Sequence, residues 1–239
     1  MKKTKLVSLV TLIAAIILQI FTFCRDTYSS YEFGFAIGIS AEYRSGNVVL
    51  TLINYMIPLI FILFFTSGSM QDLIQGYGKV LLVRNYSRTK LGVKQLFKNL
   101  ITLLIIVLFQ CSAILYFNRF LKNVKNGILE SLIMYFVILS AIVILQCLLE
   151  FYLQSQIVNA VLFAYSFVSY CIVQVTGNIA VLGNIAVLKI ILFPSLMFGM
   201  QNGAVSGESI YYLYLCIGVI LNTVLAVLCI RKFKKTDIF

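Results

Sequence analysis

The side chains best placed for chemistry in this sequence are amides set inside long apolar runs. Carboxamides donate and accept hydrogen bonds, so they are suited to hold neighbours or ligands rather than to transfer protons. The six are Asn54, Gln110, Gln146, Asn159, Gln174 and Asn222. If the runs cross a membrane, polar side chains within them face protein or water. The six are therefore candidates for lining a path through a membrane, with hydrogen bonding between helices as the commoner alternative.

Ionisable chemistry is sparse along the chain. The sequence has no histidine, which excludes histidine-based acid–base catalysis, Ser–His triads and the histidine-bearing metal motifs. The six cysteines are scattered without a C-x-x-C pair and are expected to behave as small apolar side chains. Glu150 is an acid at the inner end of the fourth apolar run, where it fits an interfacial group or a cap for the following turn. We expect no enzyme, no metal site and no cofactor on this chain.

The elements that carry these residues are the apolar runs themselves. The chain has 239 residues, of which 61% are hydrophobic and 11% charged, and a soluble domain of this length needs more polar surface. The bilayer core takes about 20 apolar residues per helix. The runs cover residues 6–23, 48–65, 100–117, 128–149, 157–175 and 209–230. Because they are continuous rather than alternating, they predict an all-α membrane protein with six transmembrane helices in one domain, residues 1–239.

Both ends of the chain are predicted to lie in the cytoplasm. The first run follows a basic start, as in a signal peptide, but it is long and lacks a small-residue cleavage site, so we interpret it as a retained span. Short cytoplasmic loops are enriched in lysine and arginine. With both termini inside, most basic residues fall on the inner side. The basic loop 118–127 fits this arrangement poorly, because it falls outside.

The outer segment before the last run, about residues 176–208, is interrupted by glycine and proline. It contains the tandem hexapeptide of "GNIAVLGNIAVLK" and then "FPSLMFGMQNGAVSG". Interrupted apolar segments of this kind often line a path through the membrane. We predict a re-entrant or broken helix here.

The inner segment between the second and third runs, about residues 69–98, is strongly basic. Within it, "GYGKVLLVRNYSRTKLGVKQLF" at 76–97 holds five lysines or arginines and no acid. "GYG" lacks the approach sequence of a potassium filter, and no phosphate-binding loop occurs anywhere in the chain. We expect no nucleic acid partner for a loop anchored between two spans. Attraction to anionic lipid headgroups accounts for part of its basicity.

Helical spacing of apolar residues in this segment predicts a short amphipathic helix over about 71–83. Ser69 is its expected N-cap, and Asp72 falls in the first turn, where a negative charge suits the helix dipole. Ser87 is expected to cap a second helix that runs into the third span. The simpler interpretation is a helix that rests on the lipid surface. The more specific interpretation is a docking element for a soluble partner protein.

The layout and the string "GYGKVLLVRNYSRTK" together resemble type-2 ABC exporter permeases, in particular small bacterial permeases from peptide-export and bacteriocin-immunity operons. The likeness of layout covers the whole chain, and the residue-level likeness is confined to about 71–98. In that family, the segment after the second span contains the coupling helix that docks into the ATPase. The resemblance implies a docking region made by Gly76, Tyr77, Gly78, Arg84, Ser87 and Arg88.

This resemblance gives meaning to the missing nucleotide-binding motif. It implies a separate ATPase chain that holds ATP and magnesium, and a second permease, identical or related, that completes a dimer in the bacterial plasma membrane. The expected cargo is a peptide or other amphipathic molecule. The alternative is a non-transporting immunity or sensor protein that binds a toxin or partner directly.

Overall fold

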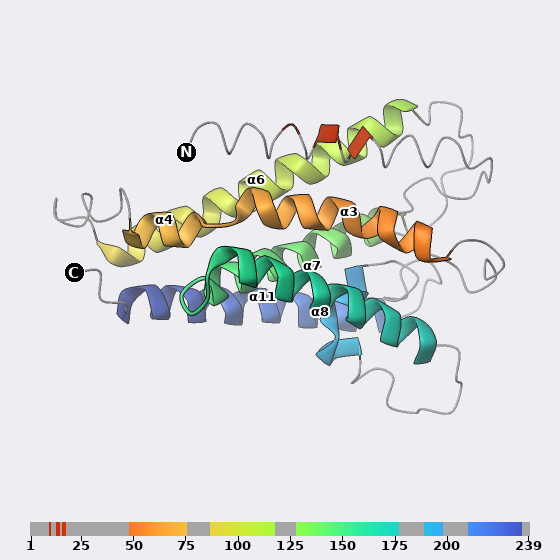
Figure 1. Cartoon of the computed structure of the whole chain (residues 1–239). Coiled ribbons are helices and arrows are strands. Elements are labelled where there is room, and N and C mark those ends of the chain that lie inside the picture. Colours follow the sequence, from red (N-terminus) through yellow and green to blue (C-terminus); the bar gives the residue numbers. More distant parts are fainter. Residues whose placement is uncertain are drawn as a thin grey trace.

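The computed structural model describes residues 10, 13–14, 16–17, 48–75, 87–117, 128–176, 189–197 and 210–235. Within these ranges the regular structure is entirely helical, and no strand is present. The elements are α3 (Val48–Thr66), α4 (Ser69–Gln75), α6 (Arg88–Phe117), α7 (Ile128–Leu149), α8 (Ser155–Thr176), η2 (Phe193–Met197) and α11 (Ile210–Lys235). The long helices lie alongside one another as a bundle (Figure 1).

Five described helices are long and apolar enough to cross a membrane. They are α3 running on into α4, then α6, α7, α8 and α11, and they confirm the helices expected at the second to sixth apolar runs. The first expected span, residues 6–23, lies mostly outside the described residues. Of it, Ile16 is buried against the main apolar cluster of the bundle.

α7 is the central helix of the described bundle. Its residues between Met134 and Cys147 are almost all buried, because α7 packs against α3, α6, α8, η2 and α11. Its closest partner is α11, where Gly218 allows the two backbones to approach. A Cβ atom on Gly218 would lie 2.9 Å from Cγ1 of Val137. A helix that is apolar on all sides is the kind that occupies such a central place.

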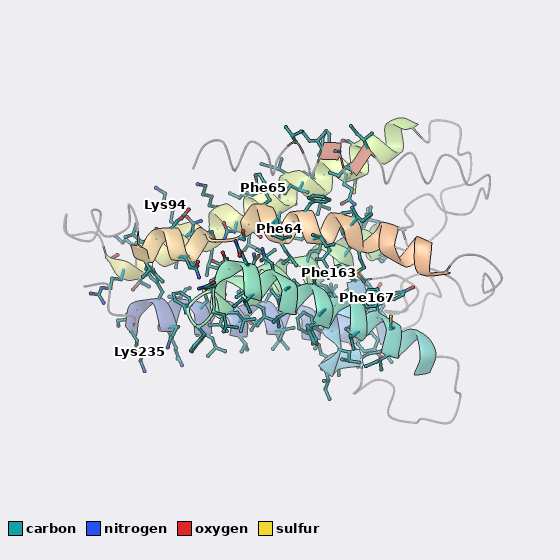
Figure 2. All side chains as sticks on the ribbon, viewed as in Figure 1. Phe64, Phe65, Lys94, Phe163, Phe167 and Lys235 are labelled. Atoms are coloured by element: carbon teal, nitrogen blue, oxygen red, sulfur yellow. The ribbon has the colours of Figure 1, made fainter. Side chains whose placement is uncertain are left out.

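One end of the bundle is basic, and we call it the basic end. Here Leu91 near the start of α6 and Phe233 near the end of α11 are buried together, with Leu73, Ile74 and Phe151 packed against them. Every described basic residue except Lys189 belongs to the start of α6 or the end of α11. Figure 2 shows Lys94 and Lys235 at this end.

The start of α6 extends well beyond what a span requires. α6 has 30 residues, which at 1.5 Å per residue gives about 45 Å, against a hydrocarbon core of roughly 30 Å. The helix begins directly after Ser87, whose carbonyl accepts the N–H of Leu91 at 3.2 Å. The expected helix start at Ser87 is therefore confirmed, and the third span is continuous with the basic segment before it.

The described part of the outer segment, residues 189–197, contains η2. All five η2 residues are buried, and the element packs against α7 and α8. The Ser169 hydroxyl donates to the Leu192 carbonyl at 2.7 Å and accepts the N–H of Ser195 at 3.2 Å. A short, non-spanning helical turn thus lies among the long helices, while the GNIAVL repeat lies outside the described residues.

Candidate functional site

The candidate site begins at the junction between α3 and α4, at the basic end. α3 ends at Thr66, and Gly68 has a φ of 72°, in the left-handed region that glycine adopts without strain. The Gly68 carbonyl accepts the N–H of Asp72 at 2.8 Å, so Gly68 is the N-cap residue of α4. The expectation that Ser69 is the N-cap is therefore wrong, and Ser69 is the first residue inside the helix.

Glu150, one residue past the end of α7, supplies the cap that Gly68 lacks. Its Oε1 accepts the N–H of Gly68 at 2.7 Å, and its Oε2 accepts the N–H of Met70 at 3.1 Å. Glycine has no side-chain oxygen to satisfy the first N–H groups of a helix. The Glu150 carboxylate therefore caps α4. The sequence predicted that Glu150 would cap the turn that follows it, whereas it caps a turn about 80 residues earlier in the chain.

Gln71 reinforces this connection from the side of α4. Its Nε2 donates to the carbonyl of Leu153 at 2.9 Å and lies 3.4 Å from that of Glu150. α4 is therefore joined both to the Glu150 side chain and to the backbone of the turn between α7 and α8.

Burial gives Glu150 an unusual titration. The side chain is 3% exposed, and desolvation raises its pKa from 4.5 to about 7, because the charged form loses water. The N–H groups of Gly68 and Met70 oppose the rise and the charge of Asp72 adds to it. The other titratable neighbours are Cys147 on α7 and Cys229 on α11. No basic side chain of the described residues forms an ion pair with Glu150.

A second group of contacts joins α6 to the same place. Asn99 on α6 is buried, and its Nδ2 donates to the Ser69 hydroxyl at 2.8 Å and to the Cys147 sulfur at 3.2 Å. Gln95, one turn earlier, donates to Asn99 Oδ1 at 3.2 Å. Ser69 thus serves as an acceptor for α6 rather than as a helix cap.

One turn deeper, Gln146 joins α3, α7 and α8. Its Nε2 donates to the Leu63 carbonyl at 2.7 Å and to Asn159 Oδ1 at 2.8 Å, and its Oε1 accepts the Thr66 hydroxyl at 2.7 Å. The Leu63 carbonyl fixes which end of the Gln146 amide is nitrogen, since only N–H can donate there. This in turn directs Asn159 to present its oxygen, and its buried Nδ2 has no partner.

The other predicted path residues are distributed along the bundle rather than gathered at this place. Asn222 on α11 donates to the Val137 and Gly218 carbonyls, at 2.9 Å each, and accepts the Ser140 hydroxyl at 2.8 Å. Gln110 on α6 is fully buried, and the Tyr135 hydroxyl lies 3.5 Å from its Oε1. Apart from the Asn222 bond to Gly218, which lies within α11, these contacts are hydrogen bonds between helices. The side chains of Asn54 and Gln174 lie outside the described residues.

The predicted docking residues are described only at their C-terminal end. Gly76, Tyr77, Gly78 and Arg84 lie outside the described residues. Ser87 is exposed directly before α6. Arg88 is the first residue of α6, and its guanidinium lies 3.5 Å from the Lys234 carbonyl of α11.

The sequence did not single out several residues of this site, among them Gly68, Thr66 and Asn99. A glycine directly after an apolar run and before an expected helix start is a signal for Gly68. Asn99 precedes the apolar run of the third span, and no local pattern shows that it reaches Ser69, thirty positions earlier. Glu150 was singled out, but its partners lie too far away in sequence for spacing to find them.

The fold and these contacts define a helical integral membrane protein whose spans are joined by buried hydrogen bonds between side chains. The chain belongs to the DUF2705 family, described as proteins of unknown function, whose profile matches residues 12–239. It is 26% identical over 245 residues to a Bacillus subtilis (strain 168) protein described as uncharacterized protein YybK, covering 95% of this chain and 94% of that protein. No solved structure matches the chain.

Proposed function

We propose that the chain is the membrane-spanning subunit of an ATP-driven ABC exporter, with ATP and magnesium bound by a separate ATPase chain. It moves or expels a peptide or another amphipathic molecule. A second permease, identical or related, completes the pathway in the bacterial plasma membrane, with the basic end in the cytoplasm. The similarity to a Bacillus subtilis protein is in keeping with a bacterial membrane.

The observation that carries this proposal is that the basic segment is anchored to the bundle at both ends. At its start, Glu150 accepts two N–H groups of the α3–α4 junction. At its end, Leu91 and Gly92 on α6 meet Phe233 of α11, and a Cβ on Gly92 would lie 3.0 Å from the Phe233 ring. A segment held in this way is suited to pass a force from a docked ATPase to the spans.

The charges at the basic end support the same assignment. The start of α6 presents Lys90, Lys94 and Lys98 on its exposed surface, and α6 contains no acid. Short cytoplasmic segments carry such an excess of lysine and arginine. A partner protein with an acidic surface is attracted to such a patch over a Debye length of about 8 Å at physiological salt.

The test is co-purification of the tagged chain with the products of its neighbouring genes, in mild detergent. We expect a stoichiometric ATPase, which is lost when Arg84 and Arg88 are both changed to glutamate. The matched control changes Arg231 and Lys235 to glutamate, because both are exposed at the basic end but lie outside 71–88. If both variants lost the ATPase equally, the contact would be general charge attraction, and the coupling role of residues 71–88 would be refuted.

Absence of any ATPase, under conditions that preserve oligomers, would refute the exporter proposal. The basic segment would then be interpreted as a lipid-contacting surface. The protein would be interpreted as a stand-alone immunity or sensor protein, which is the alternative function. Direct binding of a toxin to the purified chain would support that alternative.

A further inference from the structure

The backbone at the start of α4 is bound to the bundle by one carboxylate. The Gly68 and Met70 N–H groups both donate to the carboxylate of Glu150, at 2.7 and 3.1 Å. The first N–H groups of a helix have no partner inside the helix, and Gly68 offers no side-chain oxygen of its own. Glu150 therefore holds the backbone at the start of α4, while Ser69 and Gln71 add side-chain bonds to α6 and to the turn between α7 and α8.

The same carboxylate leads directly into the rest of the basic end. Glu150 begins the turn between α7 and α8. Phe151, the next residue, packs against Phe233 of α11, with the rings tilted by 54° and their centroids 6.2 Å apart. A displacement of α4 that pulls on Glu150 thus acts on the end of α7, on the start of α8 and on α11.

We propose that Glu150 is the positioning residue that locks α4 to the end of α7 and passes movements of the basic segment to the turn between α7 and α8. The origin of that movement, an ATPase docked on the segment, rests on the proposed function above. The lock itself depends only on the contacts of Glu150, so the two are tested separately.

The lock is tested by hydrogen–deuterium exchange of the purified chain in lipid nanodiscs. Changing Glu150 to leucine removes both acceptors, and we expect exchange of the Gly68 and Met70 amides to rise at least tenfold. Glu150→Gln keeps one acceptor oxygen and is expected to restore part of the protection. Unchanged exchange at α8 and α11 shows that each variant is folded, and Glu130→Leu, which changes the acid at the opposite end of α7, is the matched control.

Two results would overturn the lock. One is that the Gly68 and Met70 amides exchange at the same rate in the wild type and in Glu150→Leu. The other is that Glu130→Leu accelerates them equally, which would show general loosening of α7 rather than loss of a specific acceptor.

Transmission is tested on the complex with the co-purified ATPase, with and without ATP and vanadate. In the wild type we expect nucleotide to change exchange both in the basic segment and across residues 146–154. In Glu150→Leu, the ATPase should stay bound while the change at 146–154 is lost, and Glu150→Gln should recover part of it. A full response to nucleotide at 146–154 in Glu150→Leu would refute Glu150 as the transmitting residue. Failure to recover any ATPase would refute the proposed function, and the lock would then be judged by the exchange test on the purified chain alone.

Discussion

The close approach of α7 and α11 at Gly218 makes the effect of Gly218→Ala on stability depend on one methyl group, Cγ1 of Val137. With this methyl group present we expect the substitution to destabilise the fold, and without it we expect no destabilisation. An alanine at 218 places its Cβ 2.9 Å from Cγ1 of Val137, and overpacking of this kind costs about 1–3 kcal/mol. Replacing glycine by alanine inside a helix gains roughly 1 kcal/mol of helix propensity. Because the steric cost exceeds this gain, we expect Gly218→Ala to lower the free energy of unfolding by up to about 2 kcal/mol.

Removing the obstructing atom should reverse the effect. In a Val137→Ala background Cγ1 is absent, and the next atoms, Cδ1 of Ile138 at 3.7 Å and Cε of Met134 at 4.0 Å, are at ordinary contact distance. Gly218→Ala should then be neutral or stabilising by up to about 1 kcal/mol. The Asn222 bond to the Val137 carbonyl at 2.9 Å involves only backbone on the α7 side, so it survives both changes.

The assay is reversible denaturation in mixed micelles for the wild type, both single variants and the double variant. The double-mutant cycle should give a coupling free energy of at least about 1 kcal/mol. Val219→Ala, on the exposed face of the same helix, is the control for changes in helix propensity. A coupling near zero, or destabilisation by Gly218→Ala of equal size in both backgrounds, would refute the close approach as the cause.

Three further outcomes are expected. Gln146→Leu should lower the free energy of unfolding by about 1–3 kcal/mol, because Asn159 and Thr66 lose a buried partner; exposed Gln154→Leu should have little effect in the same denaturation assay. Gly68→Ala should cost about 1–2 kcal/mol through its φ of 72° alone, since no atom lies within 4 Å of the new Cβ, and Gly68→Asn should cost less when melting temperatures are compared. Burial raises the Glu150 pKa from 4.5 to about 7, so the folded state binds the proton more tightly than the unfolded state. The stabilisation that protonated Glu150 contributes is therefore complete below about pH 4.5 and is lost as pH rises through 7. Stability that falls from pH 5 to 8 in the wild type but stays flat in Glu150→Gln would agree with this, and identical pH profiles in the two proteins would contradict it.

Much of the fold follows from the apolar runs alone. A run of 22 residues at 128–149 became a helix with the same bounds, Ile128–Leu149, because in lipid each backbone N–H must find its partner within the helix. The start of α6 directly after Ser87 was likewise predicted from a local signal, a serine placed before the helical pattern. Both features depend on residues close together in the chain, so they can be predicted from the sequence.

The connections between helices did not follow from the sequence. The pattern nominated Gln146, Asn159 and Asn222 as polar residues at membrane depth, but a carboxamide in an apolar run looks the same whether it bonds a helix or lines a path. Only the fold brings Gln146 to the Leu63 carbonyl and Asn222 to that of Val137.

Composition and periodicity thus determined the apolar helices and the basic segments between and after them, because those properties depend on residues close in the chain. The tertiary structure decided which side chain caps α4. Local reasoning favoured Ser69, whereas Glu150, about 80 positions away, performs the capping. A buried N–H donates to whichever oxygen the packed bundle brings within about 3 Å, and that choice is made by the arrangement of helices, not by spacing along the chain.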